Sequence, residues 1–534
     1  MPLTDLRQYI EALRELADLQ EIDLPVALDL ELAAITRRCY ETGAPAPLFN
    51  AFSDHVGGMR LLGAPAGLSA RPWQSLLRVA TSLELPADSG GLEIVEAIAA
   101  NLDRPSVAPT VVEDAPCFQN VAVGDDVDLM RLPLPRLQCG DDAGGLGVWG
   151  CLVARPPNGA WTHWSLAALR RLDSLRLAAF VPPEQPLATI ARQWADVGQA
   201  MPFALALGTE PSVPFACGMC LPENVDTPAW LGALMRRPIR LVRCRTVPLE
   251  APASSEVLIE GHMHMDEIVH EPAMATIAGH RPAPLPMRRS ILRVDALAHR
   301  DDAVLPVVVA GEPVEDNHTA MGIPTAARLL HELRRAGIAV TAAWIPLQAA
   351  LHWLVVTVPR DWRRRSDIDT TADLCRRIGE VVRVSRAGES IVQVIVLNDD
   401  VDPTDQNELI FAFATRCDPL LGDVTIGRLP MRGPPTCRRP GERVAAGTRI
   451  IVCNGLPPDQ WGEAMPIRAS FRYAYAPELV HRVLRRWTEY GFATQAVATS
   501  RAAPTETLAT SAPHAHLPSP HTPMTSHTYP NNPT

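Results

Sequence analysis

The sharpest chemical pattern in the sequence is one carboxylate and two imidazoles at alternate positions. They are Glu260, His262 and His264, in a run rich in residues that favour β-strands. Residues two apart on a strand point to the same face, so these three side chains would lie side by side. One carboxylate and two imidazoles suit a Zn, Mn or Fe ion. The alternative interpretation is a polar strand face in contact with water.

A Cys-x-x-Cys pair, Cys217 and Cys220, has a spacing used in metal and redox sites. No second cysteine pair or histidine pair follows it at a suitable distance, and the segment runs into Leu221 and Pro222. The chain has 11 cysteines, an odd number spread along its length, which does not fit a disulfide framework. We therefore interpret the pair as buried, reduced thiols.

A third group of polar side chains is the run Asn398-Asp399-Asp400-Val401-Asp402, which comes after an apolar segment typical of a buried strand. Ligands of open α/β sheets bind beyond the carboxyl ends of strands. Asp and Asn are also the residues that loops and helix caps require. Both interpretations stay open for this run.

The elements around these residues change in type along the chain. Two amphipathic helices are predicted first, capped by Thr4 and Asp29, within an α/β unit that ends near Pro116. Residues 118–311 are mostly strand-like, and Asn158-Gly159 between two apolar runs indicates a hairpin. This region is predicted to be a sandwich or barrel.

Helices and strands then alternate to the end of the apolar pattern. Residues 325–335 and 405–416 are predicted helices, and residues 338–345, 351–358 and 391–397 are predicted strands. Alternation of this kind is typical of a mixed or parallel sheet covered by helices. A last helix is expected to begin at Pro477, and residues 493–534 are expected to be disordered because Ala, Thr, Ser, Pro and His dominate them.

Bulk composition excludes several classes of function. The net charge of -11 disfavours a nucleic-acid partner and an anionic membrane surface. No apolar run is long enough for a membrane-spanning helix, and the first 20 residues lack the core of a signal peptide. We therefore expect a cytoplasmic protein of two or three domains.

Several segments resemble the UbiD family of carboxy-lyases, in the same order and with similar spacing over residues 3–492. They are Asp5–Leu13, Asp29–Arg38, Ala204–Gly208, Glu256–Gly261, Glu315–Thr319, Asn398–Asp402 and Ala469–Arg472. Each segment alone is weak, but their shared order over most of the chain is specific. Pyrrole- and furan-carboxylate decarboxylases are the members of the family that the chain resembles most.

The resemblance implies an α/β (α+β multidomain) fold. Residues 1–117 would form an N-terminal α/β region, residues 118–315 a cofactor-binding split β-barrel of the flavin-reductase type, and residues 316–492 a C-terminal α/β domain. Residues 493–534 would be a tail outside these domains. Members of the family form dimers or larger homo-oligomers, so we expect the same here.

The resemblance also implies a reaction, the reversible and non-oxidative loss of CO2 from an aromatic, heteroaromatic or α,β-unsaturated carboxylic acid. Loss of CO2 leaves an sp² carbanion that no side chain can delocalise, so a cofactor must be the electron sink. In the family that cofactor is prenylated FMN, supplied by a flavin prenyltransferase. Its phosphate is held by a divalent metal ion, Mn or Mg, with K as a second cation.

Site residues carried over from the resemblance divide into three groups. The cofactor-binding positions are His163, Ser165, Gly218, Met219 and Glu260. The metal ligands are His163 and Glu260, and we add His262, two residues after Glu260, as a further candidate ligand. The catalytic acid is Glu271.

Five positions depart from the family pattern. His163 stands where the family has an Asn metal ligand, Ala168 where it has an Arg, and Pro186 where it has a metal-ligating His. Gln393 replaces the phosphate-binding Lys, and Thr276 replaces the second acid of the loop that begins at Glu271. Each lost cation on a phosphate removes a charge-assisted contact worth about 1.5–3 kcal/mol. The departures should therefore weaken cofactor binding.

Three functions stay open from the sequence. The first is a UbiD-type decarboxylase with an altered site. The second is a catalytically silent subunit or scaffold of a decarboxylase complex. The third is a flavin-independent metalloenzyme built on Glu260, His262 and His264. Absorbance of the protein co-expressed with a flavin prenyltransferase would separate the first from the others, and metal analysis would separate the last two.

Overall fold

A computed structural model shows the fold, and it divides the chain into the compact unit Met1–Arg486 and a second unit, Trp487–Thr534. The structure describes residues 2–71, 73–139, 145–146, 149–166, 168–182, 185–271, 277–280, 287–418, 423–429, 448–457, 468–471 and 473–492. The predicted tail at 493–534 lies outside the described residues. The predicted domain limits at 117, 315 and 492 stay predictions. No helix in the described ranges is long and apolar enough to cross a bilayer.

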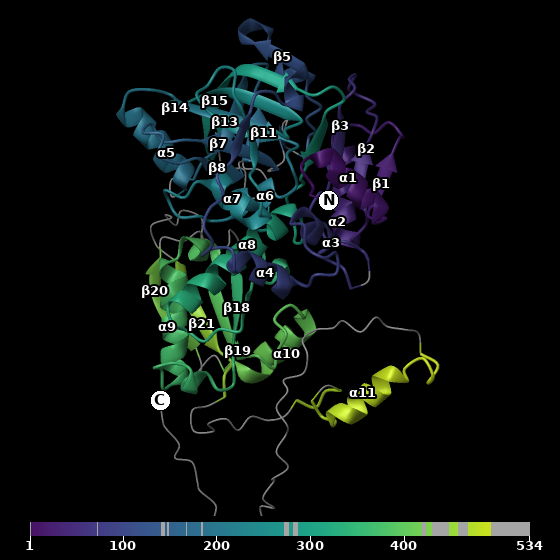
Figure 1. The fold of residues 1–534 in the computed structure, drawn as a ribbon, viewed down its shortest axis with the longest axis vertical. Coiled ribbons are helices and arrows are strands. Elements are labelled where there is room, and N and C mark those ends of the chain that lie inside the picture. Colours follow the sequence, from purple (N-terminus) through teal and green to yellow (C-terminus); the bar gives the residue numbers. More distant parts are fainter. Residues whose placement is uncertain are drawn as a thin grey trace, which may run out of the picture. The chain divides into compact units, whose positions relative to one another are not determined.

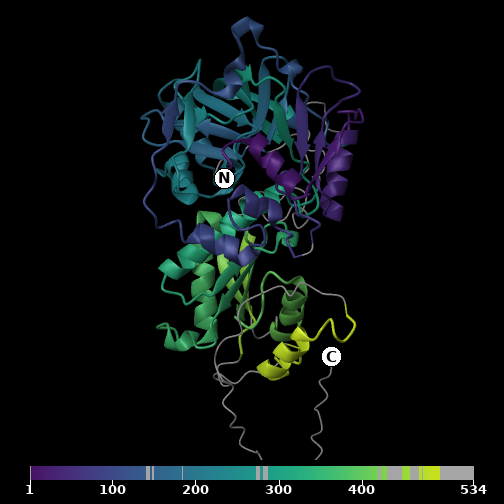
Figure 2. The same ribbon diagram turned by 45° about the vertical axis from the view of Figure 1, so that its right-hand side comes forward.

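The N-terminal elements form a four-stranded sheet covered by helices. Its strand order is β1-β2-β3-β16, and the last strand comes from far along the chain (Figure 1). The strands are β1 (Leu19–Ile22), β2 (Ala46–Phe49), β3 (Arg60–Gly63) and β16 (Val304–Val307). The helices are α1 (Leu6–Glu15), α2 (Glu31–Thr42), α3 (Leu77–Ser82) and α4 (Gly91–Ala99). Helices α1 and α2, purple in Figure 2, pack against this sheet.

Both predicted N-terminal helices exist, but each begins at a different residue from its predicted cap. Helix α1 is capped by Asp5 rather than Thr4, because the Asp5 carboxylate accepts a backbone N–H of the first turn. Helix α2 has Leu30 at this position without a side-chain cap. The predicted cap Asp29 instead forms an ion pair with Arg136.

The central region is a nine-stranded sheet, mainly antiparallel, that forms a half-barrel. Its order is β6-β9-β10-β15-β14-β11-β7-β8, with β5 also paired to β15. The strands are β5 (Asn120–Val123), β6 (Gly145–Leu146), β7 (Gly150–Ala154), β8 (His163–Leu166), β9 (Ala168–Arg171), β10 (Arg176–Phe180), β11 (Met201–Leu207), β14 (Val257–Glu271) and β15 (Met287–His299). The hairpin predicted at Asn158-Gly159 is confirmed, because it joins the paired strands β7 and β8. The flavin-reductase type of split barrel stays a prediction.

Short helices and a small sheet lie on the central sheet. They are α5 (Pro186–Asp196), α6 (Val213–Gly218) and α7 (Thr227–Met235), with strands β4 (Thr110–Val112), β12 (Arg240–Arg243) and β13 (Glu250–Pro252). Helix α6 packs against strand β8 and against the long helix α8 (Asp316–Arg335). Helix α8 also packs against α4 and against elements of the C-terminal region, so it connects that region with the central sheet (Figure 1).

Helix α8 is nine residues longer at its start than the predicted helix at 325–335. The Glu315 carboxylate caps it by accepting the backbone N–H of Asn317. Pro324 lies inside the helix rather than before it. The pattern of apolar residues therefore predicted only the second half of helix α8.

The C-terminal region is a mixed five-stranded sheet, as predicted. Strands β18, β19 and β21 are parallel, and the edge strands β17 and β20 run antiparallel to their neighbours. The strands are β17 (Ala342–Trp344), β18 (Trp353–Val358), β19 (Gln393–Asn398), β20 (Asp423–Leu429) and β21 (Thr448–Asn454). The helices are α9 (Thr371–Val384), α10 (Gln406–Arg416) and α11 (Pro477–Arg485). A short 3-10 helix, η6 (Arg386–Ser390), precedes β19 and packs against α8.

Candidate functional site

Glu260 lies in the middle of strand β14, opposite Ala204 of β11 and Ala296 of β15. Its side chain is buried, and both carboxylate oxygens accept hydrogen bonds from the loop after β12. The backbone N–H of Arg245 lies 2.9 and 2.8 Å from the two oxygens. The N–H and hydroxyl of Thr246 lie 2.7 and 2.8 Å from one of them. The chain itself therefore satisfies this carboxylate, which ties β14 to the loop.

His262 and His264 come after Glu260 along β14, but their surroundings are different. The His262 Nδ1 lies 2.6 Å from the Asp295 carboxylate, and the His262 side chain is 37% exposed. His264 is also partly exposed. Across the described ranges no three His, Cys, Asp or Glu side chains gather in a way that could hold a metal ion. The arrangement gives no support to the metal set His163, Glu260 and His262, or to the set with His264, and both stay predictions.

His163 begins the edge strand β8 and packs edge-on against Trp161, with 5.6 Å between ring centroids. Burial, together with the positive charge of Arg386, lowers the pKa of His163 to about 3. The imidazole is therefore neutral at ordinary pH and can donate one N–H. Strand β8 thus presents a neutral polar ring.

Ser165 lies two residues after His163, on the same face of β8. Its side chain is buried, and its hydroxyl has no hydrogen-bond partner among the described residues. Buried polar groups almost always have a partner, so an unpaired hydroxyl is the kind of feature that a bound ligand would satisfy. The hydroxyl fits the predicted role of Ser165 in holding a cofactor.

Gly218 and Met219 close helix α6, and both are buried. A Cβ on Gly218 would lie 2.1 Å from the carbonyl oxygen of Ala320 in helix α8. The glycine therefore allows α6 to touch the backbone of α8. This packing accounts for Gly218 without a ligand, and the cofactor-binding role of Gly218 and Met219 stays a prediction.

The cysteines are free thiols throughout the part of the chain that the structure describes, and Cys217 is buried whereas Cys220 is half-buried. Cys217 lies beside Cys151 of strand β7. Burial raises the pKa of Cys220 to about 11, against the smaller opposing effects of Arg386 and Arg328. Cys220 is therefore a protonated thiol at neutral pH.

Arg386 is the first residue of η6. Its guanidinium pairs with Glu223 at 3.4 Å, where the Arg386 side chain is 27% and the Glu223 side chain 48% exposed. Its charge acts on both His163 and Cys220. The folded chain thus forms an ion pair between Arg386 and Glu223 that the sequence pattern did not reveal.

A second buried polar group lies at the start of α8. The Tyr40 hydroxyl donates to the Asp316 carboxyl, and the backbone N–H of Ala66 lies 2.5 Å from the other oxygen of that carboxyl. Burial, followed by the negative charge of Glu315, raises the pKa of Asp316 to about 7. Asp316 therefore titrates near neutrality, although it is fully buried.

His318 connects this group to the segment that comes after Glu271. Its Nδ1 accepts the backbone N–H of Glu315 at 3.1 Å, and its Nε2 lies 2.7 Å from the Ile277 carbonyl oxygen. Because a carbonyl can only accept, Nε2 carries the proton. Glu271 ends strand β14 with its backbone opposite Met287, and its side chain is outside the description.

The positions that differ from the family pattern are spread over several elements. Ala168 begins β9, Pro186 begins α5, and Thr276 lies outside the described residues. Gln393 begins β19, and its amide nitrogen lies 3.4 Å from the Cys453 sulfur. Arg171, further along β9 than Ala168, donates to the carbonyl oxygens of Leu129 and Leu132 at 3.0 and 3.1 Å. These contacts tie β9 to the segment that carries Leu129 and Leu132.

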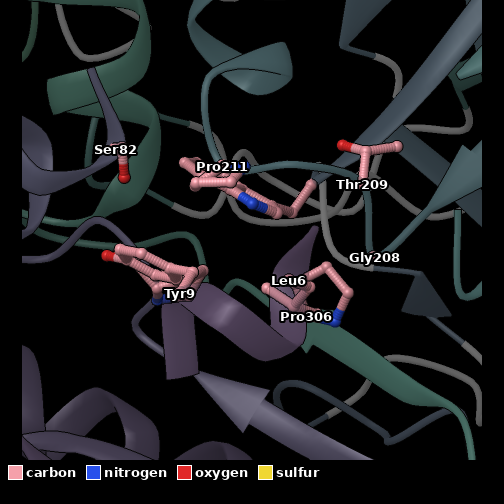
Figure 3. A pocket seen from close by; sticks show the side chains of 9 residues that line it. Leu6, Tyr9, Ser82, Gly208, Thr209, Pro211 and Pro306 are labelled. Carbon is pink, nitrogen blue, oxygen red and sulfur yellow. The ribbon is translucent and has the colours of Figure 1, made fainter. Parts of the chain in front are cut away.

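A small pocket lies elsewhere, between α1 and the end of β11 (Figure 3). Leu6, Tyr9, Ser82, Thr209 and Pro306 are among its lining residues. None of the predicted site residues lines it. We therefore do not assign it to the chemistry.

Two features of the site were missed by the sequence analysis. The motif Glu315–Thr319 was recognised only as part of the resemblance, and its burial at a helix start was not foreseen. Arg386 carried no motif at all. The sequence gives no signal that distinguishes it from the other arginines among the 49 basic residues.

Comparison with known proteins matches three family models along the chain. They are the N-terminal, Rift-related and C-terminal domains of 3-octaprenyl-4-hydroxybenzoate carboxy-lyase, UbiD, over residues 10–98, 110–313 and 318–453. The chain is 36% identical to pyrrole-2-carboxylic acid decarboxylase of Pseudomonas aeruginosa, over 91% of this chain and 98% of that protein. The matched regions contain the strands and helices that carry His163, Ser165 and Arg386.

Solved structures with the same fold include two enzymes at low sequence identity. Vanillic acid decarboxylase of Sedimentibacter hydroxybenzoicus in its closed form has a TM-score of 0.77 at 19% identity, over 92% of this chain and 99% of that chain. The UbiD-class enzyme HmfF of Pelotomaculum thermopropionicum, in an evolved dimeric form in complex with prFMN, has a TM-score of 0.69 at 20% identity, over 85% and 95%. These two likenesses concern the fold.

Proposed function

The chain belongs to the UbiD family of carboxy-lyases, and on that premise we propose that it decarboxylates a heteroaromatic or aromatic carboxylic acid with prenylated FMN. The reaction would be non-oxidative and reversible. The observation that carries this proposal is the 36% identity to a pyrrole-2-carboxylic acid decarboxylase over nearly the whole of both chains. A small heteroaromatic acid is therefore the first substrate class to test.

The cofactor would supply the electron sink for the carbon that loses CO2. His163 and Ser165 are the residues of this chain that fit it, because a buried hydroxyl without a partner and a neutral imidazole lie on one face of β8. The metal ion of the family fits less well. Glu260 is occupied by Arg245 and Thr246, so we assign no step of the reaction to a metal.

Glu271 is the proposed proton donor. When the bond between the ring carbon and the carboxylate breaks, CO2 leaves and the electron pair stays on the carbon. A carboxylic acid at Glu271 then gives its proton to that carbon and becomes a carboxylate. A positioned general acid contributes about 10²–10⁴-fold to such a step.

The test is deuterium uptake from D2O into pyrrole or furan by protein loaded with the cofactor. Exchange requires only the proton-transfer half of the reaction. Glu271→Gln should lower the exchange rate by about 10²-fold or more, because an amide cannot donate an acidic proton. Glu267→Gln is the matched control on the same strand, because Glu267 pairs with Arg293 at 2.8 Å. Exchange that is equal in Glu271→Gln and wild type would remove Glu271 from the mechanism.

A silent subunit is the second candidate function, and the replacements at Ala168 and Gln393 favour it. The same experiment decides between the two. If cofactor is bound and a broad panel of acids and products shows no exchange in the wild type, the chain is not the catalytic subunit.

A further inference from the structure

We propose that Asp226 and Thr227, at the start of helix α7, are positioning residues for the flavin, because they hold the outer edge of strand β8 and thereby fix the Ser165 hydroxyl toward the cofactor. The inference rests on the proposed function, because it concerns the same cofactor. It gives a role in binding to two residues that no motif of the sequence indicated.

Strand β8 lies at one end of the central sheet, next to β7. Its pairing with β7 places Ser165 opposite Leu152. In an antiparallel pair the backbone N–H groups of alternate residues point toward the partner strand, and those of the residues between them point away from it. The N–H groups of Thr162 and Trp164 point away from β7, and buried N–H groups of this kind need an acceptor.

The start of helix α7 supplies these acceptors. The backbone N–H of Thr162 lies 3.0 Å from the Asp226 carboxylate, and the N–H of Trp164 lies 3.3 Å from the Thr227 hydroxyl oxygen. The Thr227 N–H in turn donates to the Thr162 carbonyl oxygen at 3.0 Å. Helix α7 thus binds the edge of β8 through three hydrogen bonds, in the place where a further strand would pair.

Burial increases the effect of these hydrogen bonds. Thr162, Trp164 and Thr227 are all buried, so a backbone N–H that lost its acceptor here would carry the full cost of desolvation. The other oxygen of Asp226 accepts the N–H of Ala229 at 3.2 Å, which caps α7. One carboxylate therefore joins the first turn of α7 to the edge of β8.

Ser165 is the residue whose orientation depends on this edge. The N–H that Thr227 accepts belongs to Trp164, the residue between His163 and Ser165. The Ser165 side chain is buried, and its hydroxyl has no hydrogen-bond partner among the described residues. This observation is independent of α7, and it points to a ligand on that face of β8. A shift of the strand edge would misplace the hydroxyl, and hydrogen bonds weaken steeply with distance and angle.

Binding of FMN to the full-length apoprotein tests the inference, read by flavin fluorescence with Mn and K in every sample. Thr227→Val keeps the shape of the side chain and removes the acceptor. It should weaken FMN binding by about 2- to 10-fold, as Ser165→Ala should, because misplacing the serine hydroxyl and removing it lose the same contact. Thr227→Ser keeps the acceptor and should bind FMN within about 2-fold of wild type.

Asp226→Ser gives a second, separate test. Serine at this position still caps α7, but its single oxygen cannot also accept the N–H of Thr162. We expect FMN binding about 2- to 10-fold weaker than in wild type. Asp405→Ser is the matched control, because Asp405 caps α10 by accepting the N–H groups of Asn407 and Glu408 at 2.8 and 3.2 Å. This control should leave FMN affinity unchanged.

The effect of lost stability alone is measured with Thr357→Val. Thr357 is buried in strand β18 of a different sheet, and its hydroxyl lies 2.8 Å from that of Thr341. The variant makes the same chemical change as Thr227→Val, so it should lower the melting temperature but leave FMN affinity unchanged. If Thr227→Val did not fold, Asp226→Ser would carry the test.

A double variant shows whether Thr227 acts through Ser165. Thr227→Val combined with Ser165→Ala should bind FMN within about 2-fold of Ser165→Ala alone, because the contact is already lost. Losses that multiply in full would mean that Thr227 affects the flavin by another route, and they would overturn the inference.

The outcomes separate this inference from the proposed function. FMN affinity that is unchanged in Thr227→Val or in Asp226→Ser, or that falls just as much in Thr357→Val, overturns the inference alone. If FMN does not bind to the folded wild type, the flavin-dependent function fails, and the inference fails with it.

Discussion

At the scale of single residues, the buried carboxylates of this chain differ in what surrounds them. Glu260 receives N–H and O–H donors on both oxygens and acts as a structural anion. Asp316 lies fully buried near Glu315, and its carboxyl is protonated more easily than usual. Residue type alone does not distinguish these roles, because the partners that decide them come from other parts of the chain.

Replacement of Glu260 tests its structural role against the predicted metal role. Glu260→Ala would leave two backbone N–H groups and the Thr246 hydroxyl without an acceptor inside the protein. We expect a loss of about 3 kcal/mol or more in the free energy of unfolding, with an unchanged metal content. Thermal unfolding and elemental analysis measure the two effects.

The matched control is His262→Ala, which removes a half-exposed partner of Asp295 and should cost less than about 1 kcal/mol. If Glu260→Ala instead released a bound metal ion and kept its melting temperature, Glu260 would be a ligand as the resemblance implied.

Asp316 makes the stability of the protein depend on pH. The folded pKa of Asp316 is about 7, above the ordinary value of 3.8. Between these two pH values the folded chain therefore holds a proton that the unfolded chain has released. The stabilisation from this proton is complete below pH 3.8 and is lost as the pH rises through 7. Asp316→Asn cannot ionise, so raising the pH from about 5 to about 8 should lower the melting temperature of the wild type more than that of the variant.

Melting curves of the two proteins at several pH values give the comparison directly. Asn keeps an acceptor for the Ala66 N–H and a donor toward the Tyr40 hydroxyl oxygen. Parallel dependence of the two melting temperatures on pH would show that Asp316 does not titrate in this range.

The alternation of polar residues in the sequence predicted which residues lie on strand β14, but it did not predict their contacts with other segments. Alternation correctly placed Glu260, His262 and His264 along one strand. It could not show that Arg245 and Thr246 fold back onto the first of them, because that contact joins two separate segments. The ion pair of Arg386 was missed for the same reason, since its partner Glu223 lies 163 residues away in the sequence.

At the scale of elements, the contact between helices α6 and α8 controls the geometry near the proposed site. Helix α6 packs against β8, which carries His163 and Ser165, and against α8, which begins at the buried Asp316. Gly218 makes this close approach possible. The proposed cofactor residues and the polar start of α8 are therefore linked through one short helix.

Gly218→Ala should disturb this contact. The new Cβ would lie 2.1 Å from a backbone oxygen of α8, which cannot move as a side chain would. We expect a loss of about 1–3 kcal/mol or more in stability, together with weaker flavin binding. Gly90→Ala is the control, because a Cβ there meets nothing within 4 Å, and it should change stability by less than about 1 kcal/mol. Equal melting temperatures for Gly218→Ala and wild type would contradict the close packing.

Element boundaries were predicted well where a local cap decides them. The helix predicted at 405–416 is observed at Gln406–Arg416, because Asp405 accepts the N–H groups of Asn407 and Glu408. Helix α8 was predicted too short because its first half contains polar residues that pair with distant partners such as Tyr40 and Ile277. A pattern based on apolar spacing cannot recognise a helix start that is buried through polar contacts.

At the scale of the whole molecule, strands from distant parts of the sequence share sheets. Residues Val304–Val307 were predicted within the central β region, but they pair in parallel with β3 of the N-terminal sheet. This pairing joins the end of the central region to the N-terminal elements. The resemblance and the comparisons agree on the order of the regions, whereas the exchange of this strand required the structure.

The C-terminal segment allows a prediction about the molecule as a whole. Among residues 493–534 the large apolar side chains are Val497, Leu508, Leu517, Met524 and Tyr529, spread between Pro, Ser, Thr, His and Ala. Such a composition cannot bury enough apolar surface to offset the entropy of ordering. Truncation after Phe492 should therefore leave the melting temperature within about 1 °C of wild type.

A longer truncation, after Pro457, is the control for this experiment. It removes Arg468 and Tyr473, which both donate to the Asp400 carbonyl oxygen, at 2.7 and 2.9 Å. It also removes the ion pair between Arg468 and Glu408 at 3.0 Å, so the longer truncation should lower the melting temperature. Differential scanning fluorimetry of the three proteins measures the difference. A clear fall already on truncation after Phe492 would mean that residues 493–534 stabilise the folded protein, against the expectation from their composition.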